Sequence, residues 1–279
     1  MRSSDFVVIG HLTCDERPGG RHVLGGTATY AAITARNLGY RVGILTRAAN
    51  DFPQPELLAN IELERLHSST TTTFRNIYQD DQRQQFIRNR AGSLEAKDLP
   101  SAWRDAKIVL LGPVAGEIAT PVARAFDSKT LLGVTAQGWL RQWDETGRVH
   151  TRTWAEAAEL LPHARVLILS EQDLGEFTER LQAYITLTRV VVLTRGARGC
   201  TVFQRARMPF DAPAFRTNEV DPTGAGDVFA AAFLIRLHET NDTQEAARFA
   251  NCAASFAIAA VGTTGIPMRD QIEKRLVDG

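Results

Sequence analysis

Lysine is scarce in this chain, and several common enzyme motifs are missing from it. Only four of the 279 residues are lysines and none follows a glycine, which excludes the Gly-x-x-x-x-Gly-Lys-Ser/Thr loop of P-loop enzymes. There is no Gly-x-Gly-x-x-Gly after the first apolar run, no Gly-x-Ser-x-Gly elbow and no His-Glu-x-x-His pair. The chain therefore lacks the usual signatures of dinucleotide oxidoreductases, α/β hydrolases and zinc proteases.

Cysteines, net charge and long apolar runs are also limited. Cys14, Cys200 and Cys252 are odd in number and far apart, which argues against a disulfide framework or a cysteine-based zinc site. The 32 basic and 32 acidic side chains balance, so nothing draws the whole chain toward nucleic acid or acidic membranes. No uninterrupted apolar run is long enough to span a membrane, and the run at 6–9 is too short for a signal-peptide core. We expect a cytoplasmic protein without nucleic-acid or membrane partners.

The chain is rich in short apolar runs that alternate with helical patterns. We expect strands at about 5–10, 41–46, 106–111, 131–135, 165–169 and 189–193, and helices at about 27–38, 153–161, 243–260 and 270–276. This alternation predicts one α/β domain over residues 1–279, with a mainly parallel sheet and helices on both faces. Residues 72–78 and 84–88 instead alternate polar and apolar side chains, which predicts a β-hairpin with one wet face.

The most informative stretch is Asp221-Pro222-Thr223-Gly224-Ala225-Gly226-Asp227, which leads into an apolar run that should form a buried helix. Gly224 and Gly226 allow a tight turn and close approach of a ligand. The first N–H groups of a helix lack intrahelical partners, so this turn predicts an anion hole for phosphate. A carboxylate at Asp227 can take the proton from an attacking hydroxyl. The plainer interpretation is a glycine turn with an acid in the first helical turn.

The full run Asp-Pro-Thr-Gly-Ala-Gly-Asp-x-Phe resembles the C-terminal signature of the ribokinase-like (PfkB) family of carbohydrate kinases. Weaker similarities to that family follow in order along the chain, at Asp15, Gly25-Gly26, Ser170-x-x-Asp173 and Thr194-x-Gly196. The resemblance implies a ribokinase-like three-layer sandwich with a small β lid at about 17–25 and 68–91. It also implies phosphoryl transfer from ATP, with Mg2+, to a hydroxyl of a sugar or cyclic polyol.

The same resemblance implies roles for individual residues. Asp227 is the expected catalytic base, and the amides of Gly224, Ala225 and Gly226 are the expected anion hole. The expected substrate contacts are Asp15, Gly25, Gly26, Thr27 and Gln137. The expected nucleotide contacts are Thr194, Gly196, Gly199, Thr223 and Asn251. Asp173 is expected to orient magnesium through water, and Asp221 with Thr223 resembles a site for a monovalent cation such as K+.

Plainer interpretations remain for several of these residues. From its spacing alone Asp15 is equally a solvated acid in the loop after the first strand. Ser170 is also a good helix N-cap, with Asp173 in the first turn. Arg195 and Arg198 are as well explained by an exposed glycine turn as by bidentate contacts with phosphates.

Two departures from the family pattern bear on the substrate. Tyr30 stands where many members have asparagine, which indicates a different substrate or a ring packed beneath it. Ser170-x-x-Asp173 replaces Asn-x-x-Glu. The run Gln137-Gly138-x-x-Arg141 resembles that of inositol-kinase-like members, although Arg141 also suits ordinary loop packing.

The sequence leaves other functions and the assembly open. A nucleoside kinase is an alternative, as is a kinase of vitamin alcohols, although those branches often have cysteine where this chain has Ala225. A catalytically silent ligand-binding relative is a further alternative, against which an intact Asp227 argues. A monomer and a homodimer are both compatible with the sequence.

Overall fold

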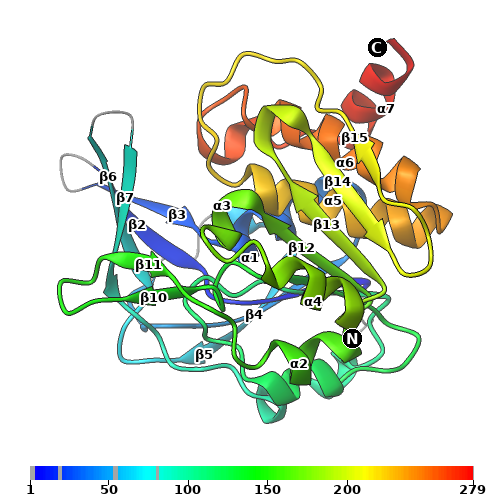
Figure 1. The fold of residues 1–279 in the computed structure, drawn as a ribbon. Coiled ribbons are helices and arrows are strands. Elements are labelled where there is room, and N and C mark those ends of the chain that lie inside the picture. Colours follow the sequence, from blue (N-terminus) through cyan, green and yellow to red (C-terminus); the bar gives the residue numbers. More distant parts are fainter. Residues whose placement is uncertain (1–3, 18–20, 53–55, 80–81, 279) are drawn as a thin grey trace.

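The structure, a computed structural model, describes residues 4–17, 21–52, 56–79 and 82–278. Its centre is a nine-stranded sheet (Figure 1). In spatial order the strands are β15 (Phe210–Ala212), β14 (Cys200–Gln204), β13 (Val190–Thr194), β12 (Val166–Ser170), β9 (Leu131–Thr135), β8 (Ile108–Leu111), β1 (Phe6–Ile9), β4 (Val42–Ala48) and β5 (Ile61–His67). All pairs from β13 to β5 are parallel, whereas β14 pairs antiparallel with both of its neighbours, β13 and β15.

The central strands are apolar along their whole length because both faces of the sheet are covered. Phe6 and Val8 point into one core cluster, and Val7 and Ile9 point into the other. The first face is covered by α1 (Thr27–Asn37), α5 (Ala225–Thr240) and α6 (Thr243–Ala257), and α7 (Arg269–Asp278) packs on α6. The predicted three-layer α/β sandwich is therefore confirmed.

The second face is covered by shorter pieces of helix than the sequence predicts. The helix expected at 153–161 is reduced to α2 (Ala157–Leu160) and a 3-10 turn. It is joined by α4 (Arg180–Leu187), and α3 (Glu171–Leu174) follows β12 directly. Buried Trp103, which belongs to another 3-10 turn, completes the packing on this side. Among the described helices none is both long and apolar enough to cross a lipid bilayer.

A separate four-stranded sheet stands beside the sandwich (Figure 1). Its strands, in spatial order, are β3 (Arg21–Gly25), β2 (Thr13–Arg17), β6 (Thr73–Gln79) and β7 (Gln82–Asn89). The predicted hairpin is present as β6 and β7. The parts of the expected lid at 18–20 and 80–81 lie outside the described residues. Phe74 and Ile87 of this small sheet pack on Val114 and Ala115 of the sandwich.

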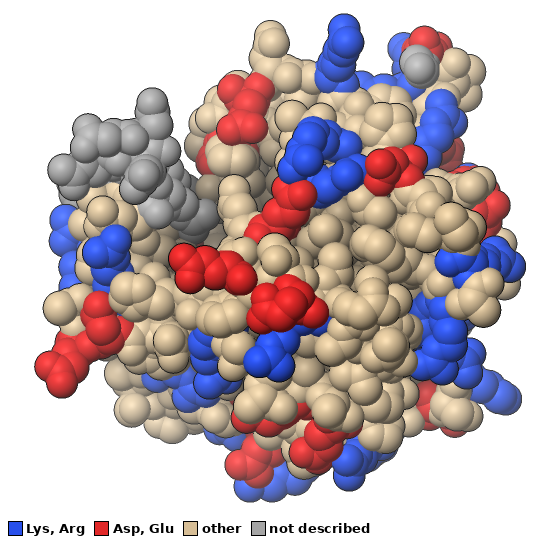
Figure 2. All heavy atoms as spheres, viewed as in Figure 1, with Lys and Arg blue, Asp and Glu red and all other residues tan. Residues whose placement is uncertain are grey.

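A second hairpin, not anticipated from the sequence, links the two sheets. Its strands are β10 (Arg141–Trp143) and β11 (Val149–Thr151). The amide of Ile87 in β7 donates a 2.8 Å hydrogen bond to the carbonyl of Gly147 in the hairpin turn. On the face shown in Figure 2, basic and acidic side chains are interspersed.

Candidate active site

Asp227 lies in the first turn of α5, directly after the glycine-rich turn. Gly224 is the residue before the helix and has φ of 80°, a left-handed conformation that favours glycine. Within the described chain, the amide N–H groups of Gly224 and Gly226 donate no backbone hydrogen bond, whereas the amide of Ala225 donates to the carbonyl of Pro222 at 3.3 Å. Two of the three expected anion-hole amides are thus available, and the third closes the turn.

The surroundings of Asp227 shift its acidity. Burial raises the pKa of Asp227 to about 6, and the charge of Asp173 acts in the same direction. The nearby Thr27 hydroxyl and the Arg141 guanidinium both lower the pKa, so they offset part of this rise. The structure therefore brings residues from α1, α3, α5 and the β10–β11 hairpin close to one carboxyl group, as expected at sites of proton transfer.

Two buried hydroxyl groups lie near this carboxyl. Among the described residues, Thr135 Oγ1 has no hydrogen-bond partner, and the Thr27 hydroxyl interacts only with the Asp227 carboxyl, whose pKa it lowers. Gly112 lies between them, because a β-carbon built there would be 2.4 Å from Thr27 Cγ2 and 3.7 Å from Thr135 Oγ1. Buried hydroxyls are normally hydrogen-bonded, so Thr135 is a candidate to bind a ligand.

Asp15 and Gly25, two of the expected substrate contacts, lie side by side, and Asp15 is in strand β2 rather than in a loop. A β-carbon on Gly25 would lie 2.8 Å from Asp15 Oδ2, so glycine leaves room for this carboxylate. The hydroxyl of Thr13 donates a 2.8 Å hydrogen bond to Asp15 Oδ1. Gly26, with φ of 85°, then starts α1, which carries Thr27. The chain therefore runs from Gly25 in the small sheet directly to Thr27, which interacts with Asp227.

Tyr30 packs beneath the glycine-rich turn. Its side chain is 2% exposed, and its Cδ1 would be 2.1 Å from a β-carbon on Gly224. This answers one question left by the sequence, because the ring supports the turn from inside the fold. Asp221 holds the same turn from the other side. Its Oδ1 accepts from the amide of Thr223 at 3.0 Å, and its Oδ2 accepts from the amide of Gly262 at 3.1 Å.

The residues that follow β9 have two roles: some pack in the core, and one lies near Asp227. Trp139 stacks on Trp154 with ring centroids 4.6 Å apart, so it belongs to the core. Gln137 is half-buried at the carboxyl end of β9. Arg141 does more than fill a loop: it donates to the carbonyl of Val114 at 3.3 Å and its charge reaches Asp227. Sequence reasoning gave Arg141 a minor place, and it missed Thr135.

The position of Thr135 did carry a signal. Thr135 ends β9 and Gly112 follows β8, so both lie at the carboxyl edge of the sheet. That edge is where open α/β sheets bind their ligands. A polar residue that closes an apolar strand beside β8 is therefore a candidate on sequence grounds.

Thr223, one of the residues expected to bind nucleotide, is in the glycine turn, and the others lie farther along this edge of the sheet with Asp173, the residue expected to orient magnesium. Ser170 and Asp173 form a capping box, in which Asp173 Oδ2 accepts from the Ser170 amide at 2.9 Å. Thr194 ends β13, and a turn containing Gly196 and Gly199 follows it. Asn251 is buried on α6 and donates to the carbonyls of Ala212 and Pro213 at 3.0 Å and 3.1 Å.

The two arginines of the turn at 194–199 are both paired with acids. Arg195 forms a 2.8 Å salt bridge with Asp211, and Arg198 pairs with Glu171. The plainer interpretation of these side chains is therefore favoured over contacts with phosphate.

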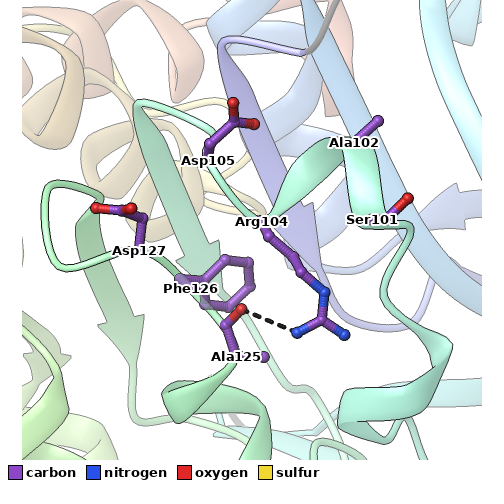
Figure 3. Close-up of a pocket in the computed structure, with 7 residues that line it drawn as sticks. All are labelled: Ser101, Ala102, Arg104, Asp105, Ala125, Phe126 and Asp127. Carbon is purple, nitrogen blue, oxygen red and sulfur yellow. Dashed lines mark hydrogen bonds between the residues drawn. The ribbon is translucent and has the colours of Figure 1, made fainter.

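A hollow at the other edge of the sheet contains none of the predicted site residues. It has a volume of about 430 Å³ and is lined by residues of 101–105 and 125–127, which precede β8 and β9 (Figure 3). There Arg104 donates to the carbonyl of Ala125 at 3.3 Å. Because ligands of open α/β sheets bind at the carboxyl ends of the strands, this hollow is a poor candidate for the active site.

The fold, with its glycine turn at the start of a buried helix, is that of a ribokinase-type α/β sandwich. Residues 16–270 match the pfkB family of carbohydrate kinases, and the chain therefore belongs to this family. Ribokinase from Mus musculus is 28% identical over 266 residues, which cover 86% of this chain and 79% of the relative. Inositol 3-kinase from Zea mays is 29% identical over 231 residues, which cover 80% of this chain and 57% of the relative.

A more even match in length is cytidine kinase from Thermococcus kodakarensis, which is 25% identical over 261 residues and covers 88% of this chain and 92% of the relative. Among solved structures, one neighbour is a pyrophosphate-dependent kinase in the ribokinase family, complexed with a pyrophosphate analog and myo-inositol. It superposes with a TM-score of 0.80 at 22% identity, and the match covers 96% of this chain and 99% of the neighbour. Nucleoside kinase from Methanocaldococcus jannaschii superposes with a TM-score of 0.79 at 19% identity, and the match covers all of both chains. These likenesses establish the fold.

Proposed function

We propose that this protein transfers a phosphoryl group from ATP, or a related nucleoside triphosphate, to a hydroxyl of a sugar or cyclic polyol. The observation that carries the proposal is the position of Asp227 at the start of α5, with a pKa raised to about 6. A carboxylate with a pKa near the working pH can accept a proton efficiently. The free amides of Gly224 and Gly226 at the same helix end suit an anionic phosphoryl group.

In the proposed step, the acceptor hydroxyl attacks the γ-phosphorus and gives its proton to Asp227. The bond from the γ-phosphorus to the bridging oxygen breaks, and the nucleoside diphosphate leaves. Asp15 holds other hydroxyls of the acceptor, because an ionised carboxylate has two acceptor oxygens. Thr135, whose buried hydroxyl has no partner among the described residues, supplies a further hydrogen bond to the acceptor, and the Thr27 hydroxyl holds the Asp227 carboxyl.

The carboxylates present fit magnesium that is carried mainly by the donor phosphates. Within the described residues no group of three or more histidines, cysteines or acids could hold a metal ion. Asp173 lies close enough to Asp227 for its charge to raise that pKa. Mg2+ in phosphoryl-transfer enzymes typically binds through one or two carboxylates, waters and substrate phosphates. When bound, the ion neutralises charge on the phosphates, and Asp173 would orient its water.

The small sheet is proposed to act as a lid over the acceptor. Asp15 and Gly25 belong to it, and Phe74 and Ile87 pack toward the sandwich. A lid of this kind excludes water, which otherwise competes with the acceptor for the phosphoryl group. Residues 17–25 and 68–91 are the segments assigned to this lid.

A cyclic polyol of the inositol type is the acceptor that we favour. Arg141 of the run Gln137-Gly138-x-x-Arg141 acts on Asp227, inositol 3-kinase is among the relatives, and a structural neighbour was solved with myo-inositol. A nucleoside acceptor is the main alternative, because a cytidine kinase and a nucleoside kinase are similar to this chain. A vitamin-alcohol kinase and a silent ligand-binding relative complete the alternatives.

The test is phosphoryl transfer by the purified protein across inositols, sugars, nucleosides and vitamin alcohols. Donors should include ATP, GTP and pyrophosphate, because relatives differ in donor. Asp227→Asn is the control, and turnover on one acceptor class that disappears in this variant would support the proposal. Donor binding without turnover on any acceptor would support the silent relative. Unchanged turnover in Asp227→Asn would exclude Asp227 as the base.

A further inference from the structure

A second group of charged side chains lies away from Asp227, around a cavity of about 670 Å³ between the segment after β15 and the helices α6 and α7. In Figure 1 these three elements lie together at one edge of the molecule. Arg216, Arg248 and Arg275 line the cavity, and Phe210 and Phe215 add apolar walls. Cavities of this size, with a few polar groups on apolar walls, are typical of small-molecule sites.

The three arginines are not neutralised by acids. Within the described part of the chain none of them forms a salt bridge, and the one acid in the cavity wall, Asp211, is already paired with Arg195 at 2.8 Å. Arg248 is held by a 2.7 Å bond to the carbonyl of Leu276. Each guanidinium has five N–H donors and keeps its charge, so donors remain for a ligand.

Arg275 is the most firmly placed of the three. It donates to Ser255 Oγ at 2.8 Å, and its guanidinium carbon lies 3.9 Å from the centre of the Phe256 ring. A guanidinium stacked in this way is pre-organised, and less side-chain entropy is lost when it binds a ligand.

The cavity lies at a suitable distance from the glycine turn. The amides of Val220 and Asp221, just before that turn, bond the carbonyl of Ile258 after α6. Farther back along the same helix, Asn251 bonds the carbonyls of Ala212 and Pro213, which also line the cavity. At the rise of an α-helix, Asn251 and Arg248 lie roughly 10 Å and 15 Å from Ile258. An extended nucleoside triphosphate with its terminal phosphate at the turn would reach the cavity with its base.

We propose that this cavity binds the base of the phosphoryl donor and selects a base with a carbonyl oxygen, so that guanine is preferred to adenine. This inference rests on the proposed function, because it takes the phosphates to bind at the start of α5. Guanine presents two neighbouring acceptors, N7 and O6, to a guanidinium. Adenine presents N7 beside an amino group, which is a donor and faces the arginine donors unfavourably. The carbonyls of Ala212 and Pro213 already accept from Asn251, which reduces what the wall offers to an amino group.

The experiment is calorimetric titration of the full chain with GDP, IDP and ADP, each with Mg2+ and without acceptor. IDP distinguishes a contact with O6 and N7 from a contact with the 2-amino group, because hypoxanthine keeps O6 and N7 but lacks the 2-amino group of guanine. We expect GDP and IDP to bind alike and roughly tenfold or more tightly than ADP, the discrimination typical of one bidentate arginine contact. The variants are Arg216→Gln, in which no described side-chain contact is lost, and Arg248→Gln. Arg189→Gln, an exposed arginine at the other end of β13, is the matched control.

The preference should shrink in Arg216→Gln or Arg248→Gln and persist in Arg189→Gln, with circular dichroism used to verify folding. Equal or tighter binding of ADP by the unmodified protein would overturn the inference. An equal loss of affinity for all three nucleotides in both cavity variants would overturn it too, because the arginines would then act only through general charge. Binding of pyrophosphate without binding of any nucleotide would also exclude a base site. Because titration needs no acceptor, these outcomes are distinct from a failure of phosphoryl transfer.

Discussion

The ring of Tyr30 fills the space where a side chain at Gly224 would stand, since a β-carbon there would lie 2.1 Å from Tyr30 Cδ1. The turn that is proposed to bind phosphate is therefore supported by a buried aromatic ring on α1. Its left-handed residue, with φ of 80°, is tolerated because glycine has no β-carbon. This relationship explains how a large ring at position 30 is compatible with the glycine turn.

We expect Gly224→Ala to damage both stability and activity. The left-handed backbone costs about 1–2 kcal/mol for alanine, and contact with Tyr30 adds to this cost, giving about 2–4 kcal/mol in all. Gly39→Ala is the control, because Gly39 has φ of 90° but a β-carbon there would have no atom within 4 Å. It should lose only the backbone component. Chemical denaturation measures both, and equal losses would show that Tyr30 does not restrict position 224.

Asp227→Asn should gain stability at neutral pH while losing turnover. The pKa of Asp227 is raised from 3.8 to about 6 in the folded protein. Below pH 3.8 the carboxyl is protonated in both the folded and the unfolded chain, so the folded state has its full stability; this stability is lost as the pH rises through about 6, because only the unfolded chain ionises easily. An asparagine carries no charge to desolvate, so the variant should be more stable by up to about 3 kcal/mol at pH 8 and nearly equal at pH 3.5. Denaturation from pH 3.5 to 8 measures this difference, with exposed Glu145→Gln as the control. A constant difference across this range would argue against a buried, charged Asp227.

Thr27→Val should move the pH profile of the reaction upward. The Thr27 hydroxyl lowers the pKa of Asp227, so its removal should raise that pKa. The acidic limb of kcat/KM, which reports the base in the free enzyme, would then shift to higher pH. Thr188→Val is the matched control, since it removes a buried hydroxyl that has no partner among the described residues and belongs to neither site. An unchanged limb in Thr27→Val would separate Thr27 from the base.

Much of this fold could be predicted from the sequence because its apolar runs lie where both faces of the sheet are covered. The runs at β1, β8 and β9 are fully buried, and their boundaries follow the pattern closely. Asp15 was placed in a loop because the residues after β1 do not alternate clearly, whereas pairing with β3 makes them a strand. Pairing between distant segments is a property of the tertiary structure that local pattern does not carry.

The site shows the same division. Asp227 and Gly224 are marked by their local sequence, because turn and helix start lie within one motif. Arg141 reaches Asp227 only because the β10–β11 hairpin folds back against β7, and nothing in its neighbours indicates this. Arg195 shows the converse. Its position in the glycine turn suits a contact with phosphate, but in the structure its guanidinium forms a salt bridge with Asp211.

Gly25→Ala should weaken acceptor binding while the protein stays folded. Gly25 has no left-handed backbone, so alanine is tolerated there, but its β-carbon would lie 2.8 Å from Asp15 Oδ2 and 2.8 Å from Thr13 Oγ1. Both contacts are with side-chain ends that can rotate away, which limits the loss of stability to about 1 kcal/mol. The displaced Asp15 carboxylate would no longer accept from the substrate hydroxyls, and losing a hydrogen bond to a charged group costs roughly 1.5–3 kcal/mol. The acceptor KM should therefore rise at least tenfold, and donor affinity should not change.

Steady-state kinetics with varied acceptor measures this effect, and Asp15→Asn should reproduce it, because the amide keeps the shape of the carboxylate but loses the charge. Gly92→Ala is the control, since a β-carbon there would make only an ordinary 3.4 Å contact with Arg47 Cδ. Its acceptor KM should match that of the unmodified protein. If Gly25→Ala and Asp15→Asn both keep the original acceptor KM, then Asp15 does not contact the acceptor, and the substrate must be held by the half-buried Gln137 and the Thr27 and Thr135 hydroxyls instead.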